Sequence, residues 1–124
     1  MKVPILKQGD CLIASIQNTL NDKDLLWLKD ELAQRVGRFR SKGVILDVTS
    51  LDVIDSFATR TIRNISEMTR LRGAEMIVVG IQPDVAFAMV QMGLKLSGAE
   101  TALDLEEGFE LLRQKAIEKN DDVD

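Results

Sequence analysis

The chain has 124 residues, of which 45% are hydrophobic and 29% charged, and its formal net charge is −4. These proportions predict one globular domain that is large enough to bury a core. The absence of histidine excludes Ser-His-Asp and Cys-His catalysis and zinc sites built on histidine. The negative charge argues against nucleic acid as the main partner.

We expect neither a targeting signal nor a membrane span. No apolar run approaches the ~20 residues that cross a bilayer, and the first ten residues lack the long apolar stretch of a signal peptide. The single cysteine, Cys11, lies in an apolar run and has no partner for an internal disulfide. We interpret it as a buried apolar residue in a reducing compartment, and therefore expect a cytoplasmic protein.

The first third of the chain predicts a hairpin followed by a helix. Residues 3–6 and 11–16 have the composition of short strands, and the tripeptide Gln8-Gly9-Asp10 between them is typical of a turn. A helix is expected to start at Asn21 or Asp22. Apolar side chains then recur at helical spacing and should face the core; they are Leu25, Leu28, Leu32, Val36 and Phe39.

The rest of the chain alternates strands and helices. The expected elements are strand 43–48, helix 56–72, strand 75–81, helix 83–92, strand 100–103 and a last helix that Asp104 caps. Gly73 and Gly93 are placed to end two of these helices, and Pro83 suits the first position of another. This order predicts a single α/β domain over residues 1–118, with a mixed, mostly parallel sheet, an N-terminal hairpin and about four helices. Residues 119–124 form an acidic tail that should fray.

The later helices differ in how clearly one side is apolar. Apolar residues of the second and fourth helices should face the core; they are Ala58, Ile62, Ile65, Met68, Leu105, Phe109, Leu112 and Ala116. The third helix, 83–92, is apolar all round, which favours burial against the sheet. The alternative is a surface patch for another protein that includes Phe87, Met89 and Met92.

Candidate site residues gather between strand 43–48 and the helix that begins at Ser56. Asp47 lies near the end of that strand, where α/β proteins often bind ligands, but the chain lacks the paired acids and the lysine of a phospho-accepting aspartate site. We expect Asp47 to hold the following loop through backbone amides. A magnesium or nucleotide site on Asp47, Asp52 and Asp55 is a less favoured alternative, because both Gly-rich phosphate-binding motifs are missing.

Asp55 and Ser56 lie at the corner where the loop enters the helix. Both residue types are ordinary N-caps, and from position alone capping is the favoured interpretation. The corner also offers unpaired backbone N–H groups and the positive end of the helix dipole. Ser56 is therefore a candidate for phosphorylation, and Thr59, one turn further on, is the second candidate.

Five short segments are individually unspecific, but their joint order and spacing are specific; they are PILK (4–7), CL-x-x-SIQ (11–17), IDSF (54–57), GIQP (80–83) and ETALDLE (100–106). With the strand 44–47 and Asp55-Ser56, the chain resembles the STAS domain family of anti-sigma-factor antagonists, and within it the small stand-alone subunits of stressosomes. The family signature ends in Asp-Ser-Ser-Gly-Leu. Phe57 and Ala58 stand where that pattern has serine and glycine.

The resemblance implies a non-catalytic regulator with no cofactor and no metal. Ser56 would take the phosphate, and Asp47, Asp52, Asp55 and Phe57 would support that site or contact a partner. The chain would hold a serine/threonine switch kinase in an assembly with paralogous sensor STAS proteins, and would release it when phosphorylated. A phosphoserine phosphatase would reset the serine, and the output would be a general stress or sigma-factor pathway.

Other interpretations stay open. A conventional anti-anti-sigma factor would bind an anti-sigma kinase directly. A purely structural subunit of an assembly would carry an incidental phosphate, and a small magnesium- or nucleotide-binding protein would use the three aspartates. The isolated chain is expected as a monomer or a homodimer.

Overall fold

The computed structural model describes residues 3–17, 20–96 and 98–122 of the chain. The strands are β1 (Ile5–Gln8), β2 (Cys11–Gln17), β3 (Gly43–Ser50), β4 (Glu75–Val79) and β5 (Glu100–Ala102), and the helices are α1 (Asp22–Phe39), α2 (Ser56–Leu71), α3 (Pro83–Met92) and α4 (Leu105–Asp122). Their order confirms the predicted alternation. None of these helices is both long and apolar enough to cross a bilayer.

The strands form one sheet in the order β1-β2-β3-β4-β5. β1 pairs antiparallel with β2, and the other neighbours are parallel, which confirms a mixed, mostly parallel sheet with an N-terminal hairpin. β1 lies two residues later than expected, because Gln8 pairs with Cys11 and only Gly9 and Asp10 form the turn. Gly9 has a φ of 60°, a left-handed conformation that two-residue hairpin turns require.

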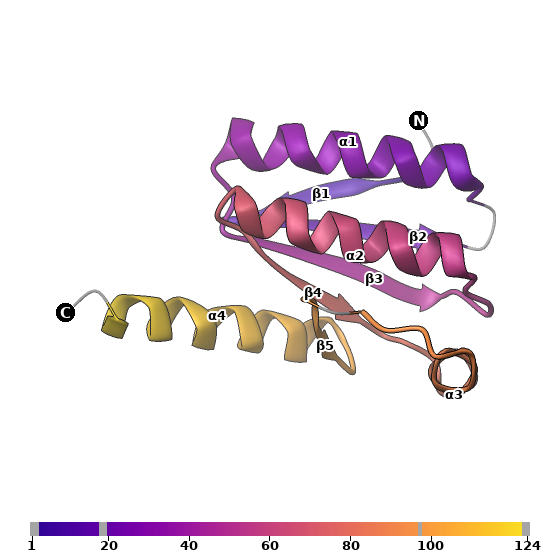
Figure 1. The fold of residues 1–124 in the computed structure, drawn as a ribbon. Coiled ribbons are helices and arrows are strands. Elements are labelled where there is room, and N and C mark those ends of the chain that lie inside the picture. The colour runs from indigo at the N-terminus through magenta and orange to yellow at the C-terminus, as the bar shows by residue number, and fades with distance from the viewer. Residues whose placement is uncertain (1–2, 18–19, 97, 123–124) are drawn as a thin grey trace.

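The helices cover the sheet unequally (Figure 1). α1 and α2 lie side by side on one face, α4 lies on the opposite face, and α3 sits beyond the end of β4. The parallel strands all run toward the same end of the sheet, so the β3–α2 loop and the β4–α3 turn meet there. This end is where open α/β sheets place their ligands.

The larger core lies between the sheet and the helices α1 and α2. Leu28 and Leu32 of α1 are fully buried there against Leu12 and Leu46 of the sheet. The expected apolar stripe of α1 is confirmed except at its end, because Phe39 is 39% exposed. Phe39 is the last residue of the helix, and the charged groups of Lys7 and Arg38 each lie 5.8 Å from the centre of its ring. The ring therefore packs against two cations and not against the core.

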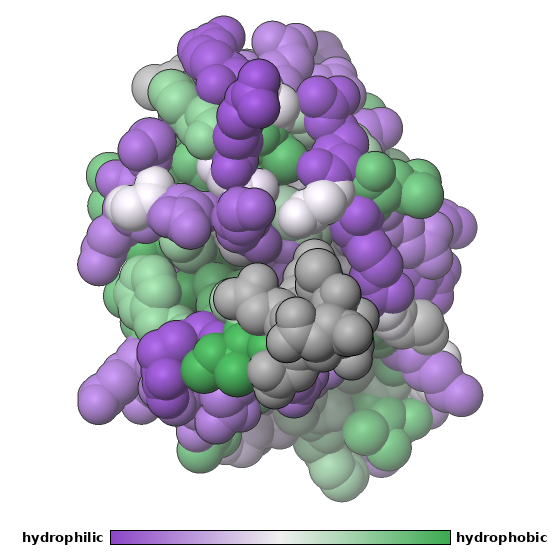
Figure 2. Space-filling view, turned by 90° about the vertical axis from the view of Figure 1, so that its left-hand side faces the viewer, coloured by the Kyte–Doolittle hydropathy of each residue, from purple (hydrophilic) through white to green (hydrophobic). Residues whose placement is uncertain are grey.

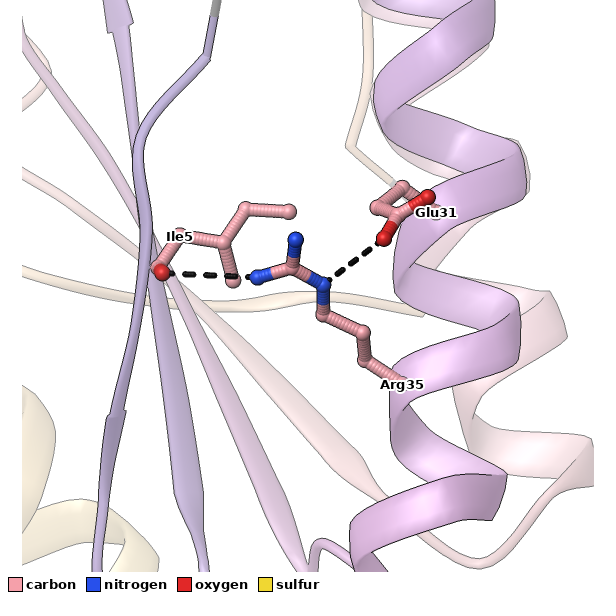
Figure 3. Close-up of polar contacts among 3 residues, drawn as sticks. All are labelled: Ile5, Glu31 and Arg35. Carbon is pink, nitrogen blue, oxygen red and sulfur yellow. Dashed lines mark hydrogen bonds and ion pairs between the residues drawn. The ribbon is translucent and has the colours of Figure 1, made fainter. Parts of the chain in front are cut away.

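Arg35 connects α1 to the exposed edge of the sheet (Figure 3). Its Nε atom donates to Glu31 Oε1 at 2.8 Å, and Nη1 donates to the backbone oxygen of Ile5 at 3.5 Å. β1 is an edge strand, and a charged side chain held over such an edge discourages pairing with another chain.

The buried side of α2 is less apolar than predicted. Ile62 and Ile65 are buried as expected, but so are four hydroxyl residues; they are Thr59, Thr61, Ser66 and Thr69. Each hydroxyl donates to a backbone oxygen at 2.9 to 3.0 Å. Burial of these polar groups is tolerated because they are hydrogen-bonded.

A smaller core lies between the sheet and α4. Phe109, Leu111 and Leu112 pack against strand residues that include Cys11 and Ile45. α4 comes very close to the strands, because a Cβ added at Gly108 would lie 2.8 Å from Val79 Cγ1. Leu105 and Ala116 were expected to face this core and are exposed, whereas the residues of α4 that pack against it lie between them.

α4 continues in helical form through Asp122, so the expected tail begins as helix, and residues 123–124 lie outside the described part.

Figure 2 faces the end of the molecule where the parallel strands begin. Its upper part is mostly hydrophilic with scattered hydrophobic patches, and further hydrophobic surface is visible lower down. A cavity of about 450 Å³ at this end is lined by residues such as Cys11, Gly43 and Leu112, at the far end of the strands from Ser56.

Candidate functional site

The candidate site is the corner where β3 leads into α2. β3 runs two residues further than predicted, to Ser50. Asp47 Oδ1 accepts hydrogen bonds from the Thr49 amide at 2.9 Å and from Thr49 Oγ1 at 2.6 Å. Asp47 therefore holds the chain that leaves the strand, as its position in the sequence predicted.

Asp55, and not Ser56, is the cap of α2. Asp55 has an extended backbone, its Oδ1 accepts from the Ala58 amide at 2.7 Å, and its backbone oxygen accepts from the Thr59 amide at 3.0 Å. This is the usual geometry of an aspartate N-cap. The sequence left both residues open as caps; the structure assigns this role to the carboxylate and leaves the Ser56 hydroxyl outside it.

Ser56 is the first residue of α2 and is exposed. The amides of Ser56 and Phe57 belong to the first helical turn, which has no carbonyl acceptors within the helix. These N–H groups and the helix dipole favour a negative group at this point. An exposed hydroxyl at such a position can accept a phosphate without a change of fold.

The second candidate, Thr59, differs sharply in its accessibility. Its side chain is only 2% exposed, and its Oγ1 donates to the backbone oxygen of Asp55 at 3.0 Å. Phosphorylation of Thr59 would require the first turn of α2 to open, whereas Ser56 needs no such movement. Phe57 is half-buried and packs at the margin of the larger core.

The loop before the corner carries two exposed acids, Asp52 and Asp55. Between this loop and the start of α1 there is an open cavity of about 440 Å³, whose lining includes Ile54, Asp55 and Leu25. A partner that approaches Ser56 therefore meets carboxylates next to a partly apolar depression. An added phosphate would raise the negative charge of this surface further.

The three aspartates do not assemble a metal site. Among the residues that the structure describes, no group of three or more His, Cys, Asp or Glu side chains is arranged to hold a metal ion. One carboxylate oxygen of Asp47 accepts from Thr49, and one of Asp55 accepts from the Ala58 amide. This geometry argues against the magnesium alternative, because those oxygens serve the loop and the cap.

Sequence reasoning missed one residue of the site, Gln82. Its Nε2 donates to the backbone oxygen of Thr49 at 2.6 Å and to Asp52 Oδ1 at 3.4 Å. Gln82 precedes α3 in the β4–α3 turn, so the two loops at this end of the sheet are joined directly. The available signal was the GIQP segment, in which only Pro83, the first residue of α3, had a predicted structural role.

α3 is only partly buried. Val85 and Met89 face the core, whereas the side chains of Phe87, Val90 and Met92 are exposed. The favoured interpretation, burial of the whole helix, is wrong for these three residues. The alternative patch is present with Phe87 and Met92 but without Met89.

The cysteine at the other end of the sheet is not part of this site. Burial raises the pKa of the Cys11 thiol to about 11, so the sulfur is protonated at neutral pH. This agrees with its interpretation as a buried apolar residue.

The chain is similar in sequence and structure to known proteins. The model of the STAS domain matches residues 2–108. The RsbT co-antagonist protein RsbRA of Bacillus subtilis is 29% identical over 109 residues, which are 88% of this chain. The chain spans only 38% of the length of RsbRA.

Solved structures agree with the sequence match. A serine-to-glutamate variant of RsbS from Moorella thermoacetica is 36% identical, with a TM-score of 0.81 over 94% of this chain and 98% of that chain. A chain in the molecular architecture of the stressosome, a signal integration and transduction hub, is 38% identical, with a TM-score of 0.78 over 91% and 98% of the two chains. The anti-sigma factor antagonist SpoIIAA in its unphosphorylated form, at 12% identity and a TM-score of 0.71, over 90% and 96%, shares the fold. The chain therefore belongs to the STAS domain family.

Proposed function

We propose that this chain is a non-catalytic, phosphorylation-regulated scaffold of a stressosome-type assembly. It holds a serine/threonine switch kinase and releases it when Ser56 is phosphorylated. The observation that carries the proposal is an exposed hydroxyl at the first position of α2, with the capping role taken by Asp55. Similarity to RsbS and to a stressosome chain supports it.

The chemistry at Ser56 is a phosphoryl transfer from ATP. Ser56 Oγ attacks the γ-phosphorus, the bond between that phosphorus and the β–γ bridging oxygen breaks, and ADP leaves. The hydroxyl proton passes to a base of the kinase. The chain contributes the acceptor and its position, and the kinase contributes the catalytic groups.

The phosphate would act as a local electrostatic switch. It adds about −1.5 to −2 charges at pH 7 to a surface that already carries Asp52 and Asp55. The first-turn amides and the helix dipole stabilise this charge on the scaffold itself. A kinase docked with acidic or apolar groups at the corner is repelled, and a loss of ~3 kcal/mol in binding free energy weakens affinity more than a hundredfold.

The remaining partners follow from the same proposal. Paralogous sensor STAS proteins would build the assembly together with this chain, in the cytoplasm, and a phosphoserine phosphatase would restore the resting state. The output would be a general stress or sigma-factor pathway. The conventional alternative, an anti-anti-sigma factor, would form a small complex with one kinase, so size-exclusion chromatography with the paralogous proteins distinguishes the two.

The proposal is tested by intact-mass analysis after incubation with ATP and the switch kinase of the same organism. We expect one added phosphate, mapped to Ser56, and none on Ser56→Ala. Ser50→Ala is the matched control, since Ser50 is an exposed hydroxyl at the other end of the same loop, and it should be labelled like the unmodified chain. Full labelling of Ser56→Ala would contradict the proposal.

A further inference from the structure

We infer that Gln82 is a positioning residue for phosphorylation, which holds the acceptor segment, residues 49–56, in place for the kinase. This inference rests on the proposed function of Ser56. It assigns to the β4–α3 turn a part in the switch that neither the cap nor the phosphoacceptor supplies. Gln82 acts through the backbone and Asp52, and not by contact with the reacting atoms.

One amide group, that of Gln82, donates two hydrogen bonds to the acceptor segment. Gln82 Nε2 donates to the backbone oxygen of Thr49 at 2.6 Å and to Asp52 Oδ1 at 3.4 Å. A primary amide carries two N–H donors on one nitrogen, so both acceptors are served together. The side chain thus joins the start of the acceptor segment to its middle, from a residue 33 positions away in the sequence.

The turn that carries Gln82 also packs closely on the acceptor segment at Gly80. This glycine has a φ of 81°, and a Cβ placed there would lie 2.0 Å from Thr49 Oγ1 and 3.2 Å from Thr49 Cα. The turn therefore lies directly on the segment. The Gly80 amide also donates to the backbone oxygen of Ala102 at 3.1 Å, so β5 supports the turn that carries Gln82.

Together these contacts fix the acceptor segment at three places. Asp47 and Gln82 hold Thr49, Gln82 holds Asp52, and Asp55 caps the helix that begins at Ser56. A segment that is already ordered loses less conformational freedom when a kinase binds it. Loss of the Gln82 bonds should therefore raise the KM for this chain and leave the KM for ATP unchanged.

The test compares two variants. Gln82→Met keeps the length of the side chain but has no hydrogen-bond donor. Gln82→Glu keeps its shape but places a carboxylate against the two acceptors, the Thr49 backbone oxygen and Asp52 Oδ1. Gln82→Lys restores donors and should rescue the effect. Gln91→Met is the control, because Gln91 is an exposed glutamine of α3, the helix that follows Gln82. Amide hydrogen exchange of the free proteins needs no kinase, and exchange in β2 and in residues 43–48 of β3 verifies that each variant is folded.

We expect faster exchange over residues 49–59 in Gln82→Met and Gln82→Glu, and rates like those of the unmodified chain in Gln82→Lys and Gln91→Met. Steady-state phosphorylation of Ser56 by the switch kinase should show a kcat/KM lower by roughly two- to tenfold. Unchanged exchange in Gln82→Met would overturn the inference, and so would faster exchange with an unchanged kcat/KM. Faster exchange in a chain whose Ser56 accepts no phosphate would support the positioning of the segment and overturn the proposed function.

Discussion

The carboxylate of Asp55 accepts a hydrogen bond from the Ala58 amide at 2.7 Å, so the helix cap and the proposed phosphate acceptor are two adjacent residues at the start of α2. Asp55→Ala removes the cap, and we expect a loss of about 1 kcal/mol in the free energy of unfolding. Asp55→Asn keeps an acceptor oxygen and should lose much less. The measurement is urea denaturation followed by circular dichroism.

Ser56→Ala is the control for Asp55→Ala in the measurement of the free energy of unfolding. The Ser56 side chain is exposed and does not cap the helix, so its removal should change the free energy of unfolding by less than about 0.5 kcal/mol. A large loss of stability in Ser56→Ala, with none in Asp55→Ala, would reverse the assignment of the cap.

Much of this arrangement could be predicted from local sequence. The hairpin turn at Gly9, the start of α3 at Pro83 and its end at Gly93 follow from residues whose backbone preferences act within a few positions. Asp47 was correctly expected to hold the following loop, because an aspartate bonds nearby amides readily. The corner at Ser56 was likewise found from the change of pattern between strand and helix.

The missed features depend on which face of each element meets the sheet. Thr59 was named as the second phosphorylation candidate from its place one turn into the helix, yet its hydroxyl donates to the Asp55 carbonyl and the side chain is buried. The bond from Gln82 to Thr49 follows from the packing of two loops, and nothing local to either residue indicates it. α3 was expected to be buried because it is apolar all round. The sequence pattern of a helix does not show whether each of its sides has a neighbour in the fold.

Two valines on α3 test how that helix is packed. Val85 is 3% exposed and Val90 is 78% exposed. Val85→Ala should lower the free energy of unfolding by about 2 kcal/mol through lost burial and a small cavity. Val90→Ala should change it by less than about 0.5 kcal/mol. Equal losses in thermal or urea denaturation would mean that this face of α3 is covered in solution.

Two glycines within helices should respond in opposite directions to alanine. At Gly37 the added Cβ meets the side chain of Arg72, which is exposed and can move. Gly37→Ala should therefore stabilise the protein by up to ~1 kcal/mol, the gain in helix propensity. At Gly108 the Cβ meets Val79 Cγ1 at 2.8 Å and Ile45 Cδ1 at 3.4 Å, both buried.

Gly108→Ala should lower stability, because overpacking of about 1–3 kcal/mol outweighs the gain in helix propensity. Differential scanning calorimetry on both variants gives the comparison. A higher melting temperature for Gly108→Ala would show that α4 can move away from the sheet without lowering the stability of the protein.

The buried thiol of Cys11 predicts how the stability of the protein changes with pH. Burial raises its pKa from 9.0 to about 11 in the folded state, so the unfolded chain loses the thiol proton first. The stability from this residue is complete below pH 9, falls as the pH rises toward 11, and levels off above that. The stability of Cys11→Val should decline less over this range than that of the unmodified chain, measured by urea denaturation at each pH. An equal decline in both proteins would show that the thiol is not shielded.

The charge at position 56 should decide whether the kinase stays bound. Ser56→Asp places one negative charge beside Asp55, and Ser56→Asn has nearly the same size without the charge. If repulsion releases the kinase, Ser56→Asp should weaken its binding at least tenfold, equivalent to ~1.4 kcal/mol, and Ser56→Asn should bind like the unmodified chain. Surface repulsion is screened by salt, so the difference should shrink between 50 and 500 mM NaCl, as measured by isothermal titration calorimetry. Equal weakening by both variants would indicate a steric effect, and unchanged binding of Ser56→Asp would contradict the electrostatic mechanism.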